Sequence, residues 1–547
     1  MTGRLPLSVA WTAAWLVLVM VALYTRPPLP VDETRYLAVA WEMHVGGDYL
    51  VPHLNGAPYS HKPPLLFWLI NLGWALFGAV EWWARTVAPL FALGSLVLSG
   101  FLARRLWPDR PDVAAMAPVV LIGSIFWATA ATLTLFDMLV CFFTLAALLG
   151  VADAARHRGS MGWRGWRGWA VAGVALGLGI LSKGPVALVY MLPAPLTAPL
   201  WAAPPAARHG GGGWLGWYAG LAGAVILGAA LALAWALPAA EAGGEAYANA
   251  ILWEQTAGRI SDSFAHERPW WFYLAMLAGG LLPWTVWPPV WRGLGRGRAF
   301  LDEPGNRFCL AWLLLSGTAL SFISGKQPHY FAPALPAAAL LVASALGMAD
   351  ARRRRLDGAL PALLFAVPIV ALVALLTASL MPEAVALPPW ARDMAHFAGL
   401  PLALAAVAAA VWPAPTLSRR AAMLAAAALL LVLAAHLTAQ PHLKGAFDVA
   451  PAARHAAALQ RQGRAVAVVG KYHGQFHFPG RLEKPVDAVW EHHARAWAEA
   501  HPGGKLFAYQ KAMPDGARPE FIQRYRNGVI AVWDAAAVAA RPALVKR

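Results

Sequence analysis

Long apolar runs recur along most of the chain and restrict its fold more than any other feature. A helix that crosses the hydrocarbon core of a bilayer needs about 20 mostly apolar residues. Of the 547 residues, 59% are apolar and only 13% are charged, whereas about a quarter are charged in an average soluble domain. The sequence therefore predicts an all-α polytopic membrane protein with about 13 transmembrane helices. The thirteen predicted spans are 5–24, 84–103, 113–131, 133–151, 169–183, 185–203, 214–236, 271–291, 308–324, 330–348, 359–380, 397–413 and 421–438.

Arginines gather in every second connection between these runs. In multi-pass proteins such loops face the cytoplasm, so we expect a cytoplasmic N-terminus and an external segment after residue 439. The loops also account for most of the formal charge of +16, which favours anionic membrane lipids over nucleic acid as partners. The clusters are Arg104, Arg105 and Arg110; Arg156, Arg158, Arg164 and Arg167; Arg208; Arg292, Arg296, Arg298 and Arg307; Arg352–Arg355; and Arg419 and Arg420.

The chain divides into a membrane body, residues 1–438, and a C-terminal tail, residues 439–547, in which no membrane span is predicted. Two long external loops, 25–83 and 237–270, interrupt the body, and the apolar segment Pro64–Val80 in the first is expected to be an interfacial or re-entrant helix. Short apolar stretches separated by helical patterns predict a small C-terminal α/β domain. The expected strands are Ala465–Val469, Lys505–Tyr509 and Asn527–Val532, and the expected helices are Ala452–Arg461 and Val489–Ala500.

The first external loop places charged side chains directly beside the membrane. Asp32, Glu33, Arg35 and Lys62 occur there among aromatic residues. Charges at a membrane boundary are costly to keep, so they often mark a substrate site. An ordinary solvated loop would explain the glycines and prolines of this segment, but not these charges.

A further acidic residue, Asp137, stands at the external entrance of the fourth span, in Thr-Leu-Thr-Leu-Phe-Asp. A carboxylate at mid-span costs roughly 2.5–3.5 kcal/mol, and less near the interface. We expect a functional role, and the alternative is a helix N-cap. Lys183 lies in the short external turn between the fifth and sixth spans, where it is either functional or a snorkelling lysine.

Further cations lie in two other external segments. The second loop contains Arg259 and Arg268, and a tight external turn contains Lys326 and Tyr330. Together with Arg35 and Lys62 of the first loop, they predict a basic pocket suited to a phosphate or diphosphate. Two carboxylates beside such a pocket suit the positioning, or deprotonation, of an acceptor at a sugar carbon. The pattern indicates glycosyl transfer from a lipid-linked phosphosugar, because a phosphate leaving group needs charge stabilisation and no general acid.

Three motifs of the first loop resemble the ArnT-like, lipid-carrier-dependent glycosyltransferases, which are bacterial relatives of the protein O-mannosyltransferases. Further segments that match the family in order are Phe136-Asp137-Met138, Ser182-Lys183-Gly184, Leu282-Pro283-Trp284 and Gly325-Lys326. The resemblance implies the GT-C fold, a monomeric enzyme of the bacterial inner membrane, and an undecaprenyl-phosphate-sugar donor. It favours transfer of 4-amino-4-deoxy-L-arabinose to a lipid A phosphate on the periplasmic face. The first-loop motifs are Asp32-Glu33-Thr34-Arg35-Tyr36, Val51-Pro52-His53-Leu54-Asn55-Gly56 and Lys62-Pro63-Pro64.

By this likeness, Asp32 and Asp137 are the catalytic or acceptor-positioning carboxylates. The residues expected to hold the donor phosphate are Arg35, Lys62, Arg259, Arg268, Lys326 and Tyr330. Further candidates for substrate contact are Glu33, Tyr36, Tyr59, Lys183 and Glu254.

The chain departs from the family at one position of the first loop. An acidic residue commonly precedes the motif lysine, whereas His61 stands there in this sequence. If that position binds a metal, His61 and His266 would be candidate zinc ligands; no other cofactor is expected.

Two rival functions stay open. The same fold could transfer another polyprenyl-phosphate-linked sugar to a protein hydroxyl or to another glycan. A lipid or glycan transporter would show paired discontinuous helices and a repeat between its two halves, and the sequence shows neither.

Overall fold

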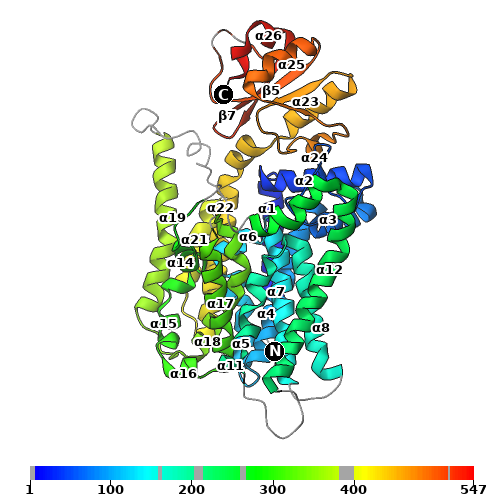
Figure 1. Cartoon of the computed structure of the whole chain (residues 1–547). Coiled ribbons are helices and arrows are strands. Elements are labelled where there is room, and N and C mark those ends of the chain that lie inside the picture. Colours follow the sequence, from blue (N-terminus) through cyan, green and yellow to red (C-terminus); the bar gives the residue numbers. More distant parts are fainter. Residues whose placement is uncertain are drawn as a thin grey trace.

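The computed structural model describes residues 7–157, 163–202, 213–258, 267–323, 325–380, 399–514, 516 and 518–546. A helical body carries a small α/β domain at one end (Figure 1). Within the described ranges, six helical segments are long and apolar enough to cross a membrane, so the polytopic helical architecture is confirmed. The number of thirteen spans stays a prediction. The six segments are Ser8–Thr25, Glu81–Leu106, Phe136–Arg156, Gly213–Glu254, Pro328–Met348 and Leu417–Arg461.

The other predicted spans are also helical, but several are broken into short pieces. Span 185–203 consists of α9 (Ala187–Met191), α10 (Pro193–Leu196) and α11 (Ala198–Trp201), because its prolines lack the backbone N–H that a continuous helix needs. The remaining helices of the body include α1 (Leu7–Thr25), α4 (Glu81–Leu106), α5 (Pro111–Ile122), α6 (Ile125–Ala130), α12 (Gly213–Asn249), α14 (Phe272–Gly280), α15 (Pro288–Leu294), α17 (Pro304–Phe322), α18 (Leu335–Met348), α19 (Leu356–Leu380), α21 (Leu400–Val411) and α22 (Leu417–Phe447).

Helices α7 (Phe136–Arg156) and α8 (Trp163–Lys183) pack at unusually short range. A Cβ atom added at Gly150 would lie 2.5 Å from the carbonyl oxygen of Gly168, and one added at Gly168 would lie 2.4 Å from that of Gly150. Small residues of this kind allow membrane helices to approach closely. Because α7 starts and α8 ends at the same end of this pair, Asp137 and Lys183 meet there.

The first external loop folds into α2 (Asp32–Gly46), a short hairpin of β1 (His53–Leu54) and β2 (Ala57–Pro58), and α3 (Leu65–Phe77). Both helices lie at the end of the bundle next to the C-terminal domain (Figure 1). The 13 residues of α3 are too few to cross a bilayer, which agrees with the expected interfacial or re-entrant helix.

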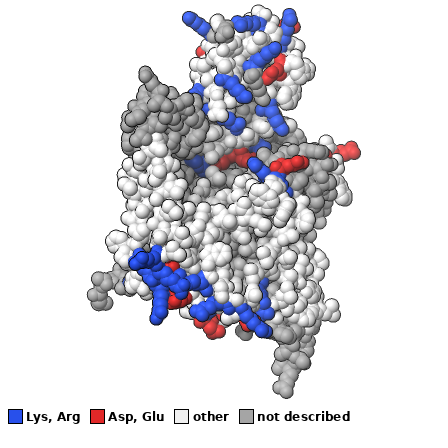
Figure 2. Space-filling view, turned by 90° about the vertical axis from the view of Figure 1, so that its left-hand side faces the viewer, with Lys and Arg blue, Asp and Glu red and all other residues white. Residues whose placement is uncertain are grey.

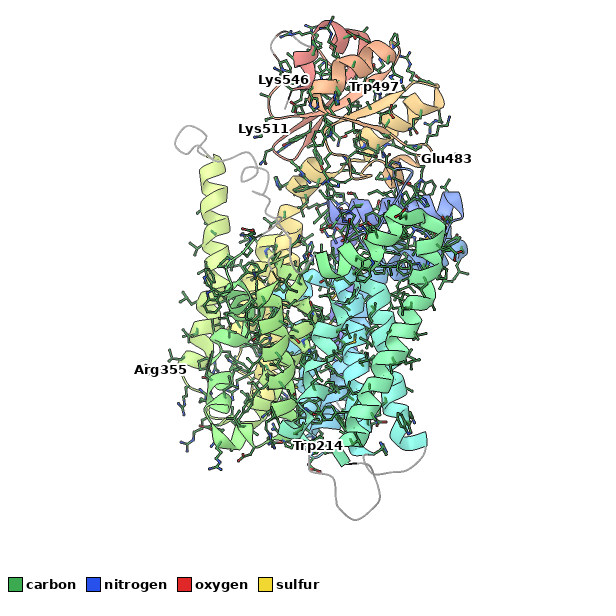
Figure 3. The ribbon with its side chains drawn as sticks, viewed as in Figure 1. Trp214, Arg355, Glu483, Trp497, Lys511 and Lys546 are labelled. Atoms are coloured by element: carbon green, nitrogen blue, oxygen red, sulfur yellow. The ribbon has the colours of Figure 1, made fainter. Side chains whose placement is uncertain are left out.

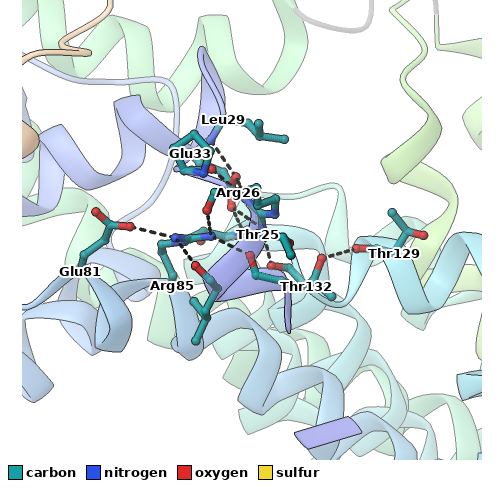
Figure 4. Close-up of polar contacts among 12 residues, drawn as sticks. Thr25, Arg26, Leu29, Glu33, Glu81, Arg85, Thr129 and Thr132 are labelled. Carbon is teal, nitrogen blue, oxygen red and sulfur yellow. Dashed lines mark hydrogen bonds and ion pairs between the residues drawn. The ribbon is translucent and has the colours of Figure 1, made fainter. Parts of the chain in front are cut away.

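A buried ion-pair network fixes the start of this loop (Figure 4). Arg26 pairs with Glu33 and donates to the carbonyl of Thr132 at 2.6 Å. Arg85 of α4 donates to Glu81 at 2.8 Å and to the carbonyl of Arg26 at 2.9 Å. The network joins α1, α2, α4 and the segment before α7, so it holds the two predicted catalytic regions in a fixed relation.

Several described loops with arginine clusters lie at the opposite end of the body. Arg292 pairs with Asp357 at 2.7 Å, Arg110 donates to the carbonyl of Ser344 at 2.9 Å, and Arg353 donates to that of Val411 at 3.1 Å. A cluster of basic side chains is visible at this lower end (Figure 2). The arginine clusters named in these contacts therefore share one end of the bundle.

The C-terminal domain has a five-stranded sheet in the order β4-β3-β5-β7-β6. The expected sheet domain is confirmed, and its three expected strands correspond to β3 (Val466–Val469), β5 (Lys505–Gln510) and β7 (Gly528–Asp534). The sequence did not predict β4 (Asp487–Val489) and β6 (Phe521–Tyr525), since β4 has three residues and both lie at sheet edges. Helices α23 (Ala450–Arg461) and α25 (Ala494–Ala500) accompany the sheet, and α22 continues past residue 438 to Phe447.

The domain docks on the first external loop through specific contacts. The Asn55 side chain donates to the carbonyl of Val486 and accepts from its N–H, both at 2.8 Å. Trp41 donates to the carbonyl of Leu482 at 2.8 Å, and Trp74 stacks on Phe478 with ring centroids 5.1 Å apart. The loop is thus held between the membrane body and the C-terminal domain.

Candidate functional site

Asp137 and Lys183 form a buried ion pair at the outer end of the α7–α8 pair. The Lys183 Nζ lies 2.5 Å from Asp137 Oδ1, and their side chains are only 9% and 3% exposed. Asp137 lies in the first turn of α7, but its side chain does not cap the described helix. Asp137 is therefore ion-paired at this membrane boundary and does not have the geometry of an N-cap. A buried charge needs such a partner.

Three side chains of other elements surround this pair. In the 3₁₀ segment η3 (Pro328–Ala334), His329 Nε2 lies 3.9 Å from Asp137 Oδ2. The ring of Tyr330 lies beneath the Lys183 ammonium, at 4.1 Å from the centroid, which is a cation–π geometry. Tyr190 of α9 donates to the carbonyl of Tyr330 at 2.6 Å and so fixes the segment.

Asp32 and Arg35 form a second, more accessible pair in the first turn of α2. They are ion-paired, and their side chains are 36% and 18% exposed respectively. Both residues belong to the first turn because α2 begins at Asp32, and a carboxylate there interacts favourably with the helix dipole. Asp32 therefore presents a partly open carboxylate with a fixed cation beside it.

Tyr36 lies between the two pairs. Its hydroxyl donates to Asp32 Oδ1 at 3.4 Å, and its ring packs edge-on against Phe136, the neighbour of Asp137, at 4.8 Å. Burial raises the pKa of Tyr36 well above its ordinary value, and the charges of Asp32 and Asp137 act in the same direction. Tyr36 is thus a protonated hydrogen-bond donor at neutral pH.

The two pairs belong to one electrostatic site. His329 interacts electrostatically with Asp137 and Lys183, and also with Asp32 and Lys62 of the first loop. Lys62 Nζ lies 3.3 Å from the carbonyl of His61. The structure therefore brings Asp32, Asp137, Lys62 and Lys183 around a common centre.

Tyr59 and His61 line the first-loop side of this centre. Tyr59 is buried, and its ring stacks on His61 with centroids 5.4 Å apart. Although burial would lower the pKa of Arg35, the neighbouring Tyr59, Tyr36 and Asp32 outweigh it and raise that pKa. The Arg35 guanidinium thus stays charged among aromatic rings.

The second external loop meets the turn that contains Lys326. Lys326 is buried and donates to the carbonyl of Arg268 at 3.2 Å, and Glu267 forms an antiparallel bridge with Gly325. The Arg268 guanidinium is exposed above the ring of Phe272. Glu254 is exposed in the middle of the π-helix η1 (Ala250–Gly258), and Arg259 and His266 lie outside the described residues.

Glu33 has a different environment from the other candidates. Its carboxylate is buried, pairs with Arg26 and accepts the backbone N–H groups of Thr134 and Leu29 at 2.7 and 2.9 Å. Burial would raise the pKa of Glu33, but the charges of Arg26 and Arg85 outweigh it and lower that pKa. All these contacts are internal and favour a structural role for Glu33, and its expected substrate contact stays a prediction.

A metal centre finds little support in the donor set. Among the described residues, no three His, Cys, Asp or Glu side chains gather as metal ligands. His61 is stacked on Tyr59, and Asp137 already has an ammonium partner. We therefore derive no catalytic step through a metal.

The candidate set drawn from the sequence omitted one residue at the centre and one at its edge. His329 was overlooked because a histidine in a turn carries no signal of its partners. His473 of the C-terminal domain interacts electrostatically with Arg35 and Asp32, across more than 400 residues of sequence. Only the docking of the domain reveals that proximity.

The amino-acid sequence is similar to a family of glycosyltransferases and to named bacterial relatives. The family model described as "Dolichyl-phosphate-mannose-protein mannosyltransferase" matches residues 9–242. A protein of Pseudomonas paraeruginosa named "Undecaprenyl phosphate-alpha-4-amino-4-deoxy-L-arabinose arabinosyl transferase" is 34% identical over 324 residues, which cover 58% of this chain and 55% of that relative. A second transferase of that name, from Pseudomonas fluorescens, is 30% identical over 382 residues, covering 66% and 63%. The matched region thus spans little more than half the length of the first relative.

Two solved structures resemble the chain over almost its whole length. The crystal structure of ArnT from Cupriavidus metallidurans in the apo state superposes with a TM-score of 0.72 at 19% identity, covering 97% of this chain and 98% of ArnT. The chain is ArnT-like. The structure of the same ArnT bound to undecaprenyl phosphate gives a TM-score of 0.69 at 20% identity, covering 96% and 97%.

The resemblance to ArnT-like proteins with the GT-C fold, inferred from the first-loop motifs, is therefore confirmed. The apolar helices and the bacterial relatives make this ArnT-like chain a multi-pass protein of the bacterial inner membrane.

Proposed function

We propose that this ArnT-like protein is an integral-membrane glycosyltransferase. It moves a sugar from an undecaprenyl-phosphate carrier to an envelope acceptor, with 4-amino-4-deoxy-L-arabinose and a lipid A phosphate as the preferred pair. The observation that carries the proposal is the convergence of Asp32, Asp137, Lys62 and Lys183 at one end of an apolar bundle. The names of the relatives support the donor, the sugar and the reaction class.

The site suits departure of a carrier phosphate. As the glycosidic bond breaks, negative charge grows on the phosphate, and fixed cations in a poorly hydrated site stabilise it. We assign this task to Arg35 and Lys62 of the first loop, and the charged Arg35 guanidinium and the Tyr36 hydroxyl beside Asp32 support the assignment. Lys326, Arg268 and Tyr330 complete the proposed phosphate-binding set from the far side.

The role of the carboxylates depends on the acceptor. A phosphate acceptor is already anionic and needs no general base, so Asp32 would orient the donor, for instance through its amino group. A hydroxyl acceptor would need Asp32 as the base. Asp137 is paired with Lys183, so we assign it to positioning rather than to proton transfer.

We infer thirteen membrane spans, a cytoplasmic N-terminus and a periplasmic C-terminal domain, and a monomer as the working unit. The orientation is supported by the arginine contacts at the end of the body away from the site, because such loops face the cytoplasm. It places the site at the periplasmic surface, where nucleotide sugars are absent and a lipid carrier supplies the sugar.

The decisive experiment is mass spectrometry of lipid A from cells with and without this protein, in a host that makes undecaprenyl-phosphate-aminoarabinose. We expect a mass increment of one aminopentose per modified phosphate, absent with Asp32→Asn. A protein that is inserted and folded but gives no increment would overturn the lipid A assignment. The search would then move to other polyprenyl-phosphate sugars and to protein or glycan hydroxyls as acceptors.

A further inference from the structure

A cavity of about 220 Å³ lies between the C-terminal domain and the first external loop. Pro30, Val31 and Thr34 form its membrane-side wall. Residues of strands β3, β5, β6 and β7, together with the segment after β3 and the turn after β6, form the other wall. Pockets for whole drug-sized ligands enclose roughly 300–1,000 Å³. The cavity therefore has the size for part of a larger molecule, such as one phosphorylated sugar ring of a lipid.

The cavity occupies the edge of the sheet where open α/β folds bind ligands. Strands β3 and β5 are parallel, and the lining residues Val469 and Tyr509 stand at or near their carboxyl ends. Ligands in such folds bind in the crevice outside the carboxyl ends of parallel strands. The same edge faces the start of α2 and hence the candidate catalytic site.

The charged lining of the cavity is entirely basic. Lys471, His473 and Arg526 line it, and none of its described lining residues is acidic. The guanidinium of Arg526 interacts with the Tyr525 side chain, but its Nε is buried and has no hydrogen-bond partner among the described residues. A buried donor without an acceptor is costly, so an anionic oxygen atom would satisfy it.

Aromatic rings complete the lining. Tyr509, Tyr525 and Phe476 border the cavity, and the Arg526 guanidinium lies over the ring of Tyr525, at 5.2 Å from its centroid. Flat rings offer an apolar face to a sugar ring, while arginine and lysine bind its phosphate.

The cavity also adjoins the candidate catalytic site. The wall residues Val31 and Thr34 flank Asp32 in sequence and fold. Burial lowers the pKa of His473, and the charge of Arg35 lowers it further while the charge of Asp32 raises it. His473 of the C-terminal domain therefore interacts with both charged residues of the first turn of α2. A headgroup held in the cavity would lie next to Asp32.

We propose that this cavity binds the phosphorylated sugar headgroup of the lipid acceptor, with Lys471 and Arg526 as its phosphate ligands. The inference rests on the proposed function, since it assigns the acceptor of that reaction to the C-terminal domain. The donor phosphate would remain with Arg35 and Lys62, so the two anionic substrates would occupy separate basic sites.

The test compares the full-length protein with two double variants in lipid nanodiscs. Lys471→Ala with Arg526→Ala removes both proposed ligands, whereas Lys511→Ala with Lys546→Ala removes two exposed positive charges of the same domain (Figure 3). The probes are bisphosphorylated lipid A, fully dephosphorylated lipid A and undecaprenyl phosphate, each titrated by native mass spectrometry without turnover. Thermal unfolding confirms that each variant is folded.

We expect the first variant to bind bisphosphorylated lipid A roughly tenfold or more weakly, since two charge-assisted contacts are lost. Dephosphorylated lipid A should bind the unmodified protein about as weakly, and undecaprenyl phosphate should bind both proteins equally. The charge-retaining pair Lys471→Arg with Arg526→Lys should recover most of the affinity. Unchanged affinity for lipid A, an equal loss in the Lys511/Lys546 control, or a loss confined to undecaprenyl phosphate would each overturn the proposal.

Binding and turnover separate the two proposals. Lipid A that binds through Lys471 and Arg526 without any sugar transfer would refute the proposed function alone. Transfer that proceeds with an unchanged acceptor KM in the Lys471/Arg526 variant would refute the acceptor cavity alone.

Discussion

The two carboxylates of the site differ in what they contact, and this sets different roles. Asp32 is partly exposed beside Arg35, whereas Asp137 is buried against Lys183. The sequence predicted that both are functional, because acidic side chains are costly to keep at a membrane boundary. It could not divide their roles, since the partners of Asp137 come from α8 and η3, far away in sequence.

Asp32→Asn and Asp137→Asn should each reduce kcat by roughly 100-fold or more, within the range for a lost acid–base or positioning group. Asp32→Asn should insert and be expressed normally, whereas Asp137→Asn leaves the buried Lys183 without its anionic partner, so its kcat is compared only after thermal unfolding shows that it is folded. Glu483→Gln removes one negative charge from an exposed position of the C-terminal domain and should leave transfer unchanged in a lipid A mass assay. Full activity in both aspartate variants would contradict the site assignment.

The pH–rate profile shows which task Asp32 performs. An Asp32 that deprotonates a hydroxyl acceptor gives a kcat that falls on the acid side as the carboxylate protonates. An Asp32 that only orients the donor should give the same profile with a phosphate acceptor as with a hydroxyl acceptor, because its charge acts on the donor in both reactions. The measurement is kcat against pH for the two proteins with a phosphate acceptor and with a hydroxyl acceptor.

Lys183→Ala should destabilise the protein by about 3–5 kcal/mol, because it leaves Asp137 buried without its partner. The measurement is thermal unfolding in detergent. Adding Asp137→Asn to Lys183→Ala should restore much of the loss, since no buried charge then remains. A single variant as stable as the unmodified protein would show that the pair is more hydrated than its geometry indicates.

At the scale of elements, the docking of the C-terminal domain on α2 depends on a neutral histidine. His477 accepts or donates a hydrogen bond with Tyr472 at 2.8 Å and lies 3.5 Å from Glu42 of α2. Burial lowers the pKa of His477 from its ordinary 6.5 to about 4. Burial also raises the pKa of Glu42, so the two groups respond to pH in opposite directions.

Between pH 6.5 and 4 the unfolded state binds a proton at His477 that the folded state does not. The titration of His477 therefore lowers the free energy of unfolding as the pH falls from 6.5 to 4. Glu42 has the opposite effect, because its raised pKa favours a bound proton in the folded state. His477→Gln removes the first of these effects only. We expect the unmodified protein to lose more thermal stability from pH 6.5 to pH 4 than His477→Gln does, and equal losses would contradict this assignment.

At the scale of the whole molecule, the orientation can be tested with single cysteines. The two natural cysteines, Cys141 and Cys309, are buried, so they should not react. Arg355→Cys should be labelled by an impermeant maleimide only after the membrane is opened, whereas Lys511→Cys should be labelled in intact spheroplasts (Figure 3). The reverse pattern would place the site in the cytoplasm.

The architecture was predictable wherever one physical signal dominated. Apolar runs and arginine placement predicted the helical body, and alternating apolar segments predicted the C-terminal sheet. Contacts between distant segments were not predictable, and Glu33 shows why. Its charge and position suggested a substrate contact, but its partner Arg26 and the N–H of Thr134 can be recognised only once α1, α2 and the segment before α7 are folded together.

The position of the first loop between two bodies has an evolutionary consequence. Trp74 stacks on Phe478, and the Arg481 guanidinium lies over the ring of Trp41, so side chains of the loop and of the C-terminal domain must fit one another. A chimaera that exchanges only the domain between two relatives would leave these partners mismatched. A chimaera that exchanges residues 25–83 together with the domain would keep the contacts between the loop and the domain. New acceptor preferences should therefore arise through paired changes in the loop and in the domain.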